Sequence, residues 1–355
     1  MSTRSTGAGI LVALLSAAAF ATSGPFAKSL LDAGWTPGSV VLLRIAGAAL
    51  LLLVPTLRAL DGRWHLLRSG WTKIVAYGVV AVAVPQLAFF YAVEHLSVGV
   101  ALLLEYLGLV LVVAWQCLVG RSLPRLPTVG GIVLAVIGLV LVLDLPLFGQ
   151  GGGVRVDGVG VIWGLIAAVG LGSYFLMSGH AAKDPLPPLV LAGGGLVVAG
   201  VLFAVLGATG LLPMRFSTHA VELAGATVPW WAAVVELAVI AAATAYVTGI
   251  VAARVLGAKL ASFVGLSEVL FVVPFAWVLL GELPRPVQLV GGLFILAGVV
   301  AVRTEQERGP EDRLPRASVV ELGRVAGEAP SDDLPVVPHD RVELGGVDVV
   351  AAQHH

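Results

Sequence analysis

Four charged side chains interrupt otherwise apolar stretches of the sequence: Arg44, Glu105, Glu236 and Glu268. A charged group costs about 2.5 to 3.5 kcal/mol to insert at the centre of a membrane helix, so one that persists needs a partner, a cavity or a function. A guanidinium binds carboxylates through paired hydrogen bonds, and a carboxylate binds an ammonium group. These residue types therefore predict a site for a small molecule that carries both charges.

The carboxyl groups also predict proton chemistry. Low-dielectric surroundings penalise a carboxylate, so a buried glutamate can exchange a proton near physiological pH and couple solute movement to a proton gradient. For Glu105, this role and a structural ion pair with Arg44 are both open. Glu268 could instead bond a neighbouring helix, and Glu236 follows a tryptophan pair that could anchor its helix at the membrane interface.

Four polar side chains in other apolar stretches could line a path to this site, although each could equally bond a neighbouring helix. They are Gln86, Tyr106, Tyr174 and Tyr246. The sequence has no His cluster with metal-ligand spacing, no phosphate-binding loop and no catalytic signature, and we predict no strand. We therefore expect no metal, no cofactor, no enzymatic activity and no nucleic-acid partner.

The elements that position these residues must be membrane helices. Of 355 residues, 58% are hydrophobic and 12% charged, and mean hydropathy is +0.98. A helix needs about 20 mostly apolar residues to cross the hydrocarbon. The predicted spans are 8–27, 37–57, 71–93, 97–119, 127–147, 157–178, 187–210, 229–252, 258–280 and 286–303. This makes an all-α polytopic protein; the first stretch could also be read as a signal peptide, but nine further spans follow it.

Depth along these spans groups three of the charged residues. Counted from the span ends, Arg44, Glu105 and Glu236 each lie about 11 Å from the same side at 1.5 Å per residue, and Glu268 lies closer to the midplane. Arg44 and Glu105 thus share a depth and could pair or hold one substrate together.

Loop charges predict the orientation. With the N-terminus inside, ten basic residues fall in cytoplasmic segments and four on the opposite side, so the positive-inside rule places both termini in the cytoplasm. The ten are Arg4, Arg58, Arg63, Arg68, Lys73, Arg121, Arg125, Lys183, Arg254 and Lys259. We expect a multi-pass protein of the cytoplasmic membrane, as a monomer or homodimer in contact with lipid.

The chain contains an internal repeat. The segment from Leu118, LVGRSLPRLPTVGG, aligns with LLGELPRPVQLVGG from Leu279 at an offset of 161 that brings Gly120 onto Gly281. Two five-helix units, 1–148 and 149–303, are predicted, and an odd number of spans turns the second upside down. Residues 304–355 hold eleven acidic and five basic residues and are predicted to be a disordered acidic tail.

The repeat and its motifs resemble the EamA family of the drug/metabolite transporter superfamily. The resemblance covers residues 7–303 and is carried by GVALLLEYLGLVLVVAW from Gly99 and SEVLFVVPFAWVLLGELPRPVQLVGG from Ser267. The first half is most similar to the threonine and homoserine exporter branch. The chain departs from the family pattern where Val269 follows Glu268 in place of proline.

We therefore expect a secondary transporter that exports a small metabolite, an amino acid or a related compound, by alternating access with protons as the coupling ion. The direction is implied by the resemblance alone. A multidrug or toxic-metabolite exporter remains an alternative of the same class. A membrane-embedded enzyme would need an Asp-rich or His-bearing loop, and a non-transporting sensor would need the tail as its output.

Overall fold

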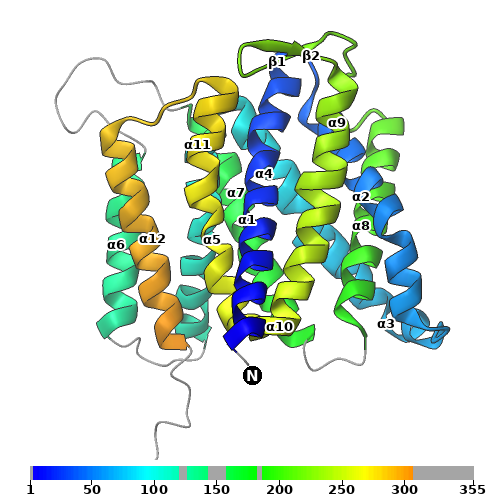
Figure 1. The fold of residues 1–355 in the computed structure, drawn as a ribbon, viewed down its shortest axis with the longest axis horizontal. Helices are drawn as coiled ribbons and strands as arrows, with labels where there is room; N and C mark the ends of the chain where they lie inside the picture. Colours follow the sequence, from blue (N-terminus) through cyan, green and yellow to red (C-terminus); the bar gives the residue numbers. More distant parts are fainter. Residues whose placement is uncertain (1–2, 120–125, 143–156, 182–185, 307–355) are drawn as a thin grey trace, which may run out of the picture. The chain divides into compact units, whose positions relative to one another are not determined.

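The computed structural model describes residues 3–119, 126–142, 157–181 and 186–306 (Figure 1). These residues belong to one unit, Met1–Glu307. The predicted acidic tail from residue 307 onward and the loops that carry Arg121, Arg125, Arg155 and Lys183 lie outside the described residues.

The first half of the described chain is entirely helical. Its elements are α1 (Thr3–Asp32), α2 (Pro37–Leu60), α3 (His65–Ala76), η1 (Tyr77–Ala83), α4 (Val84–His95), α5 (Val98–Val119) and α6 (Leu126–Val142). The three elements α3, η1 and α4 follow one another without a break and make a single span, His65–His95. Pro37 at the first position of α2 suits a helix start, because proline has no N–H to leave unpaired there.

The described part of the second half contains helices and one β-hairpin. Its elements are α7 (Gly158–Ala181), α8 (Pro188–Ala208), β1 (Val221–Leu223), β2 (Ala226–Val228), α9 (Trp230–Ala238), η3 (Val239–Thr244), α10 (Ala245–Gly265), α11 (Glu268–Leu280) and α12 (Pro286–Gln306). The prediction of no strand was wrong for this loop. Strands of three residues are too short to give a pattern, and they meet at a turn in which Ala224 and Gly225 both have positive φ, at 53° and 73°.

The apolar helices among the described residues fall into two groups by their ability to cross a membrane. Five are long enough by length and composition, and five are shorter. The long ones are Gly7–Asp32, Pro37–Leu60, His65–His95, Pro188–Ala208 and Trp230–Ala252. The shorter ones are Val98–Gly108, Val129–Val142, Gly158–Tyr174, Glu268–Leu280 and Pro286–Ala301. The prediction of a helical polytopic membrane protein is confirmed at this level.

The link between the spans predicted at 229–252 and 258–280 lies elsewhere in the structure. We expected a break at 253–257, but α10 continues to Gly265 and the chain turns at Leu266–Ser267. Residues 253–264 contain one glycine, Gly257, and no proline. As a result α11 is only 13 residues long and Glu268 lies in its first turn.

Two π-helices occupy matching places in the two halves. The segments η1 and η3 begin 162 residues apart and end 161 residues apart, within one residue of the repeat offset in the sequence. A π-turn widens the helix and leaves backbone groups without their usual α-helical partners, and such turns are frequent at functional sites. The sequence offers no signal for either of them.

Glycines bring α6 and α12 into backbone contact. A Cβ at Gly138 would lie 2.5 Å from the carbonyl oxygen of Gly291, and a Cβ at Gly298 would lie 2.5 Å from that of Gly131. Residues 131 and 138 in α6 thus face 298 and 291 in α12, so the two helices run antiparallel. Small residues permit such close approach in membranes, where lipid supplies no hydrophobic drive to hold helices together.

The N-terminal helix α1 packs against elements of the second half. The Ser16 hydroxyl donates to the Ala245 carbonyl oxygen at 2.7 Å, and Gly9 contacts Leu256, so α1 lies antiparallel to α10. Figure 1 shows α1, in dark blue, between α11 and the run of α9 and α10. The two halves are therefore interleaved, and side chains from both can meet around α1.

Candidate functional site

Three helices that carry charged residues begin at the same edge of the protein. Trp35, just before α2, contacts Trp230, the first residue of α9, with ring centroids 5.6 Å apart. The Ala224 N–H in the hairpin donates to the carbonyl oxygen of Leu279 near the end of α11, at 2.8 Å. A few residues on, the Glu282 carboxylate accepts a bond from the N–H of Val98, the first residue of α5, at 3.0 Å.

This shared edge sets the depth of the charged side chains. Arg44 lies seven residues into α2, Glu105 seven into α5 and Glu236 six into α9. At 1.5 Å per residue they sit about 9 to 11 Å inside the helix ends. Glu268 lies twelve residues before the end of α11, about 18 Å from that edge.

Arg44 is buried, with 5% of its surface exposed. One guanidinium nitrogen donates to the Ala241 carbonyl oxygen at 3.2 Å, and the guanidinium carbon lies 5.5 Å from the centroid of the Phe90 ring. Its Nε–H is buried without an acceptor. A buried donor left unpaired costs about 1 to 3 kcal/mol, so this guanidinium is available for a further ligand.

The π-helix η3 explains why Ala241 can accept this bond. In an α-helix the Ala241 carbonyl would accept from the N–H of Ala245. Here the Ala245 N–H is directed to Ile240 and Ala242 instead. The Ala241 oxygen does not accept that bond and instead accepts one from Arg44, which joins α2 to η3.

Three glutamates lie near enough to Arg44 to interact with it electrostatically. Arg44 interacts electrostatically with Tyr246, Glu236, Glu105 and Glu268, in decreasing order of strength. Within the described part of the chain, no carboxylate oxygen comes within the 4.0 Å of an Arg44 nitrogen that defines an ion pair. The direct Arg44 to Glu105 pair considered from the sequence is therefore not formed in this structure.

Glu268 and Glu236 each have a hydroxyl partner from the first half. The Tyr106 hydroxyl donates to Glu268 Oε2 at 2.9 Å, which joins α5 to the first turn of α11. A negative charge in a first turn is also favoured by the helix dipole. The Thr22 hydroxyl of α1 donates to Glu236 Oε1, while Glu236 Oε2 is buried without a partner.

The predicted polar lining residues reach the same region. The Gln86 side chain hydrogen-bonds Tyr246, and Gln86 Oε1 is buried without a partner. Tyr246 also interacts electrostatically with Tyr174 and meets Phe20 edge to face, with centroids 5.4 Å apart. We call the following set the inner cluster: Thr22, Arg44, Gln86, Glu105, Tyr106, Tyr174, Glu236, Tyr246 and Glu268.

Eight of these residues were named as candidates from the sequence, whereas Thr22, Phe90 and the Ala241 carbonyl were not named. Thr22 lies in ATSGPFA, where Ser23 is an equally plausible polar candidate. The Ala241 carbonyl depends on η3, which has no sequence signature.

The inner cluster draws on side chains from both halves of the chain. Residues 7–144 and 158–304 both match the model of the EamA-like transporter family. The chain belongs to the EamA-like transporter family. The predicted resemblance is thus confirmed, and the exporter branch stays a prediction.

Two further comparisons agree with this assignment. The uncharacterised inner membrane transporter YicL of Salmonella typhimurium is 23% identical over 309 residues, which are 86% of this chain and 98% of that protein. A solved crystal structure, 18% identical with a TM-score of 0.56, covers 85% of this chain and 98% of its own and shares the fold. This EamA-like protein is therefore a multi-pass membrane transporter.

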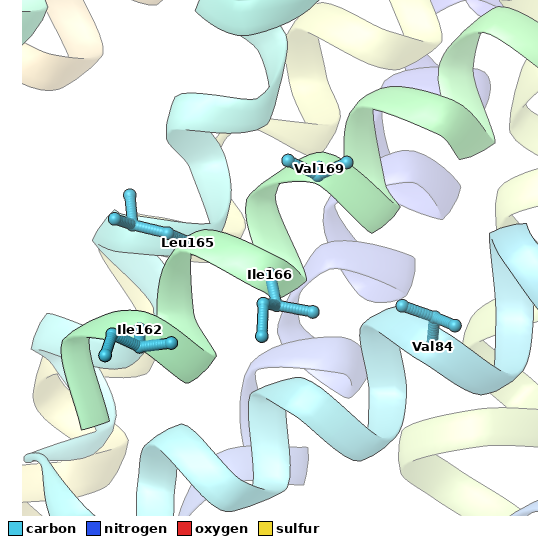
Figure 2. A pocket seen from close by; sticks show the side chains of 5 residues that line it. All are labelled: Val84, Ile162, Leu165, Ile166 and Val169. Carbon is cyan, nitrogen blue, oxygen red and sulfur yellow. The ribbon is translucent and has the colours of Figure 1, made fainter. Parts of the chain in front are cut away.

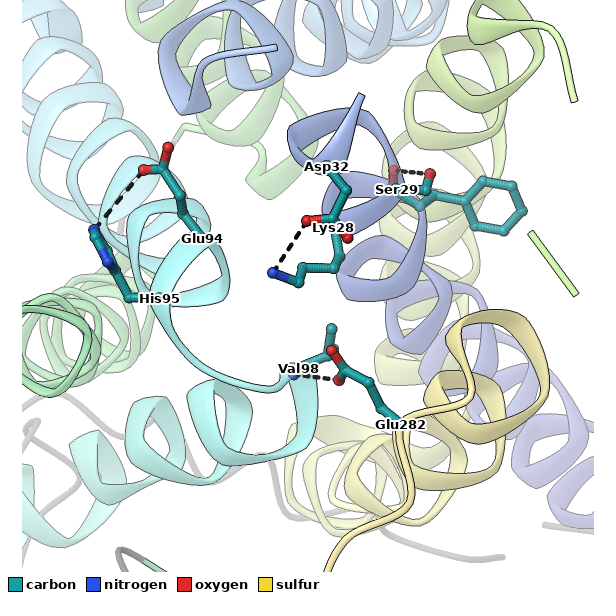
Figure 3. Close-up of polar contacts among 8 residues, drawn as sticks. Lys28, Ser29, Asp32, Glu94, His95, Val98 and Glu282 are labelled. Carbon is teal, nitrogen blue, oxygen red and sulfur yellow. Dashed lines mark hydrogen bonds and ion pairs between the residues drawn. The ribbon is translucent and has the colours of Figure 1, made fainter. Parts of the chain in front are cut away.

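A second polar group of this EamA-like chain lies at the edge where α1, α4 and α11 end (Figure 3). Lys28 pairs with Asp32 at 3.3 Å, and His95 pairs with Asp157 at 2.9 Å and with Glu94 at 4.0 Å. We call these five residues, together with Glu282 and its Val98 partner, the rim cluster. Sequence reasoning missed it because its members are dispersed in the chain.

Glu282 is a half-buried member of the rim cluster and lies in the link between α11 and α12. Burial raises the pKa of the Glu282 carboxyl group, while the Val98 N–H bond and the nearby Lys28 charge act in the opposite direction. This carboxylate joins the second half of this EamA-like chain to the first turn of α5.

One hollow in the described surface is lined by apolar side chains alone (Figure 2). It lies between α4 and α7 and is formed by Val84, Ile162, Leu165, Ile166 and Val169. It has no hydrogen-bonding side chain for a polar solute, and its apolar surface suits contact with lipid.

Proposed function

We propose that this chain is a secondary active transporter that exports an amino acid or a related compound by alternating access, coupled to protons. The observation that carries the proposal is the state of Arg44. It is a buried cation with an unpaired donor, and three glutamates interact with it electrostatically without forming an ion pair with it. A ligand with a carboxylate would supply the missing acceptor, and one of the glutamates would hold its ammonium group.

The proposed architecture is ten membrane helices in two inverted repeats, residues 1–148 and 149–303. Such repeats place the substrate near the midplane and rock one half against the other. The matched π-helices support this plan. So do the glycine contacts, since a shift of 160 residues, one fewer than the repeat offset, turns the contact of 131 with 298 into that of 291 with 138, which is the other observed contact.

The orientation is tested by accessibility labelling. Cys117 is the one cysteine in the sequence, so a Cys117→Ser background can carry single cysteines at chosen turns. With the N-terminus in the cytoplasm, Gly225→Cys in the hairpin should react with an impermeant reagent from outside the cell. Gly62→Cys between α2 and α3 should react only after permeabilisation. Reaction of both from the same side would remove the inverted-repeat proposal.

The function is tested by flux. Purified protein in liposomes is screened for exchange of amino acids and related compounds, with and without a pH gradient. We expect a pH gradient to drive accumulation of at least one zwitterionic solute, and Arg44→Gln to abolish it. Arg215→Gln, at an exposed position in the loop before the hairpin, is the matched control for loss of an arginine charge. If no solute moves under any gradient, the proposal fails.

A further inference from the structure

The contact between Thr22 and Glu236 brings one side chain from each half to the inner cluster. The Thr22 hydroxyl oxygen lies within hydrogen-bonding reach of two acceptors, Glu236 Oε1 and the Ala19 carbonyl oxygen, the latter at 2.7 Å. We propose that Glu236, positioned by Thr22, is the group at which a coupling proton and the ammonium group of the substrate replace each other. The inference rests on the proposed function and assigns its exchange step to one carboxyl group.

The hydroxyl proton of Thr22 cannot serve both acceptors at once. A threonine hydroxyl has one proton to donate and two lone pairs to accept with, whereas an ionised carboxylate only accepts. If Glu236 carries a proton, it donates to the Thr22 oxygen, and Thr22 donates to Ala19. Once Glu236 has lost the proton, the hydroxyl turns to donate to Oε1, so Thr22 can stabilise either state by rotation about one bond.

The second carboxylate oxygen provides the place for the ammonium group. Glu236 Oε2 is buried without a partner in the described structure. An unpaired buried oxygen costs less on a neutral acid than on a carboxylate, so the ionised state calls for a donor at this position. An ammonium group supplies three donors and the compensating charge.

The charged surroundings single out Glu236 from the other two glutamates. The elements packed against α9 are α1, α2 and η3, and from these Arg44 is the charged group that acts on Glu236. Among the three glutamates, Glu236 interacts with Arg44 most strongly, ahead of Glu105 and Glu268. Glu268 already has the Tyr106 hydroxyl, and its charge acts on Glu105 rather than on Glu236.

The exchange balances charge and yields export. When the site faces the cytoplasm, Glu236 releases its proton to the solution as the substrate binds, with its ammonium group on Oε2 and its carboxylate on Arg44. When the site faces outward, the substrate leaves and a proton from outside takes its place on Glu236. One proton enters for each substrate expelled, and Glu236 is never left ionised without a cation beside it.

The protonation of Glu236 can be measured without any substrate. Infrared difference spectra of the reconstituted protein between acid and alkaline pH record the carbonyl stretch of protonated carboxylic acids. We expect Glu236→Gln to remove one titrating band. Thr22→Val, which lacks the hydroxyl, should shift that band, and Thr22→Ser should restore it. If the spectrum of Glu236→Gln matches that of the wild type, Glu236 does not exchange a proton and the inference is overturned.

Flux supplies the second readout, with a zwitterionic amino acid found in the screen and its N-acetyl derivative, which lacks the ammonium group. Competition with one proton should raise the wild-type KM by up to about tenfold for each pH unit of acidification. Glu236→Gln should lose this pH dependence and all accumulation driven by a pH gradient, and Glu105→Gln should keep the pH dependence. The N-acetyl derivative should not compete. If Glu105→Gln alone lost the pH dependence of KM, the exchange would take place at Glu105 and the inference would be overturned.

The two readouts separate the failure of this inference from that of the proposed function. A titrating Glu236 band in a protein that moves no solute would remove the export proposal. Proton-driven flux that survives in Glu236→Gln would leave the export proposal intact and remove the role of Glu236. Thr22→Ser keeps the assay informative if Thr22→Val fails to fold.

Discussion

The rim cluster and the inner cluster use similar residue types in opposite ways. In the rim cluster each charged group has a partner supplied by the protein, such as Asp157 for His95 and the Val98 N–H for Glu282. In the inner cluster, atoms of Arg44, Gln86 and Glu236 are buried without partners. Natural proteins depart from full pairing of buried polar groups mainly at functional sites. The rim cluster is therefore expected to hold helix ends together, and the inner cluster to bind.

The largest expected effect is the loss of transport in Arg44→Gln. Removing a buried, hydrogen-bonded charge from a binding site costs about 2 to 5 kcal/mol, so kcat/KM should fall at least about 30-fold. Thermal stability should not fall, because the substitution removes a poorly paired buried charge. Flux and thermal unfolding of the purified protein measure the two effects, with Arg215→Gln in the exposed loop as the control. A destabilised but active variant would make Arg44 a structural residue, and the two clusters would then not differ in role.

A smaller effect is expected for Tyr106→Phe, which removes the donor to Glu268 Oε2. A hydrogen bond to a charged group contributes about 1.5 to 3 kcal/mol, so kcat/KM should fall by about tenfold or more. Tyr91→Phe is the matched control, since Tyr91 lies outside the inner cluster and stacks on Trp163, with ring centroids 4.6 Å apart. Equal losses in both variants would show that the effect comes from packing.

At the rim, substitution of Glu282 should change stability and leave transport nearly intact. Glu282→Leu removes the acceptor for the first N–H of α5, which should lower the free energy of unfolding by about 1 kcal/mol, the usual effect of losing a helix cap. Glu282→Gln keeps an acceptor oxygen and should be close to the wild type. Thermal unfolding of both variants, with flux measured in parallel, separates the cap from the charge. If Glu282→Leu lost transport with its stability unchanged, the rim would be part of the transport mechanism.

Part of this contrast could be predicted from the sequence, because long apolar stretches and the few charged residues within them are strong signals. The helical spans follow from hydropathy, and counting along them indicates that Arg44 and Glu105 lie at the same depth. The pairing of those groups does not follow from either. It depends on whether a carbonyl such as that of Ala241 is free to compete for Arg44, and that depends on the turn type of η3.

The rim cluster was missed for a different reason. Glu282 and Val98 are 184 residues apart, and neither lies in a motif that implies the other. Hydropathy also places helix ends poorly where helix-forming residues continue past the apolar stretch, as they do up to Gly265. Contacts between helix ends depend on those boundaries, so they are the least predictable part of the fold.

The pH dependence of stability sharpens the comparison further. Burial raises the pKa of the Glu282 carboxyl group above its ordinary value of 4.5, so the folded protein holds this proton more tightly than the unfolded chain. The stability that the proton contributes is fully present below pH 4.5 and is lost as pH rises through the raised pKa. Thermal unfolding of the wild type should therefore include a component that declines with pH from that point upward. Glu282→Gln should lack this component; the same decline in both proteins would assign it to another group.

The smallest expected effect is that of Asp32→Asn. Lys28 and Asp32 are four residues apart on α1 and the Asp32 side chain is 60% exposed, so their ion pair should contribute less than about 0.5 kcal/mol to stability. Transport should be unchanged. Because the Asp32 charge also disfavours ionisation of Glu282, its removal should shift the pH-dependent decline of stability toward lower pH. Thermal unfolding across the same pH series checks both parts, since a double variant with Glu282→Gln should show no shift. If Asp32→Asn changed the flux without changing stability, a surface charge that already has a partner would act in transport. The presence or absence of partners would then not distinguish the rim cluster from the inner cluster.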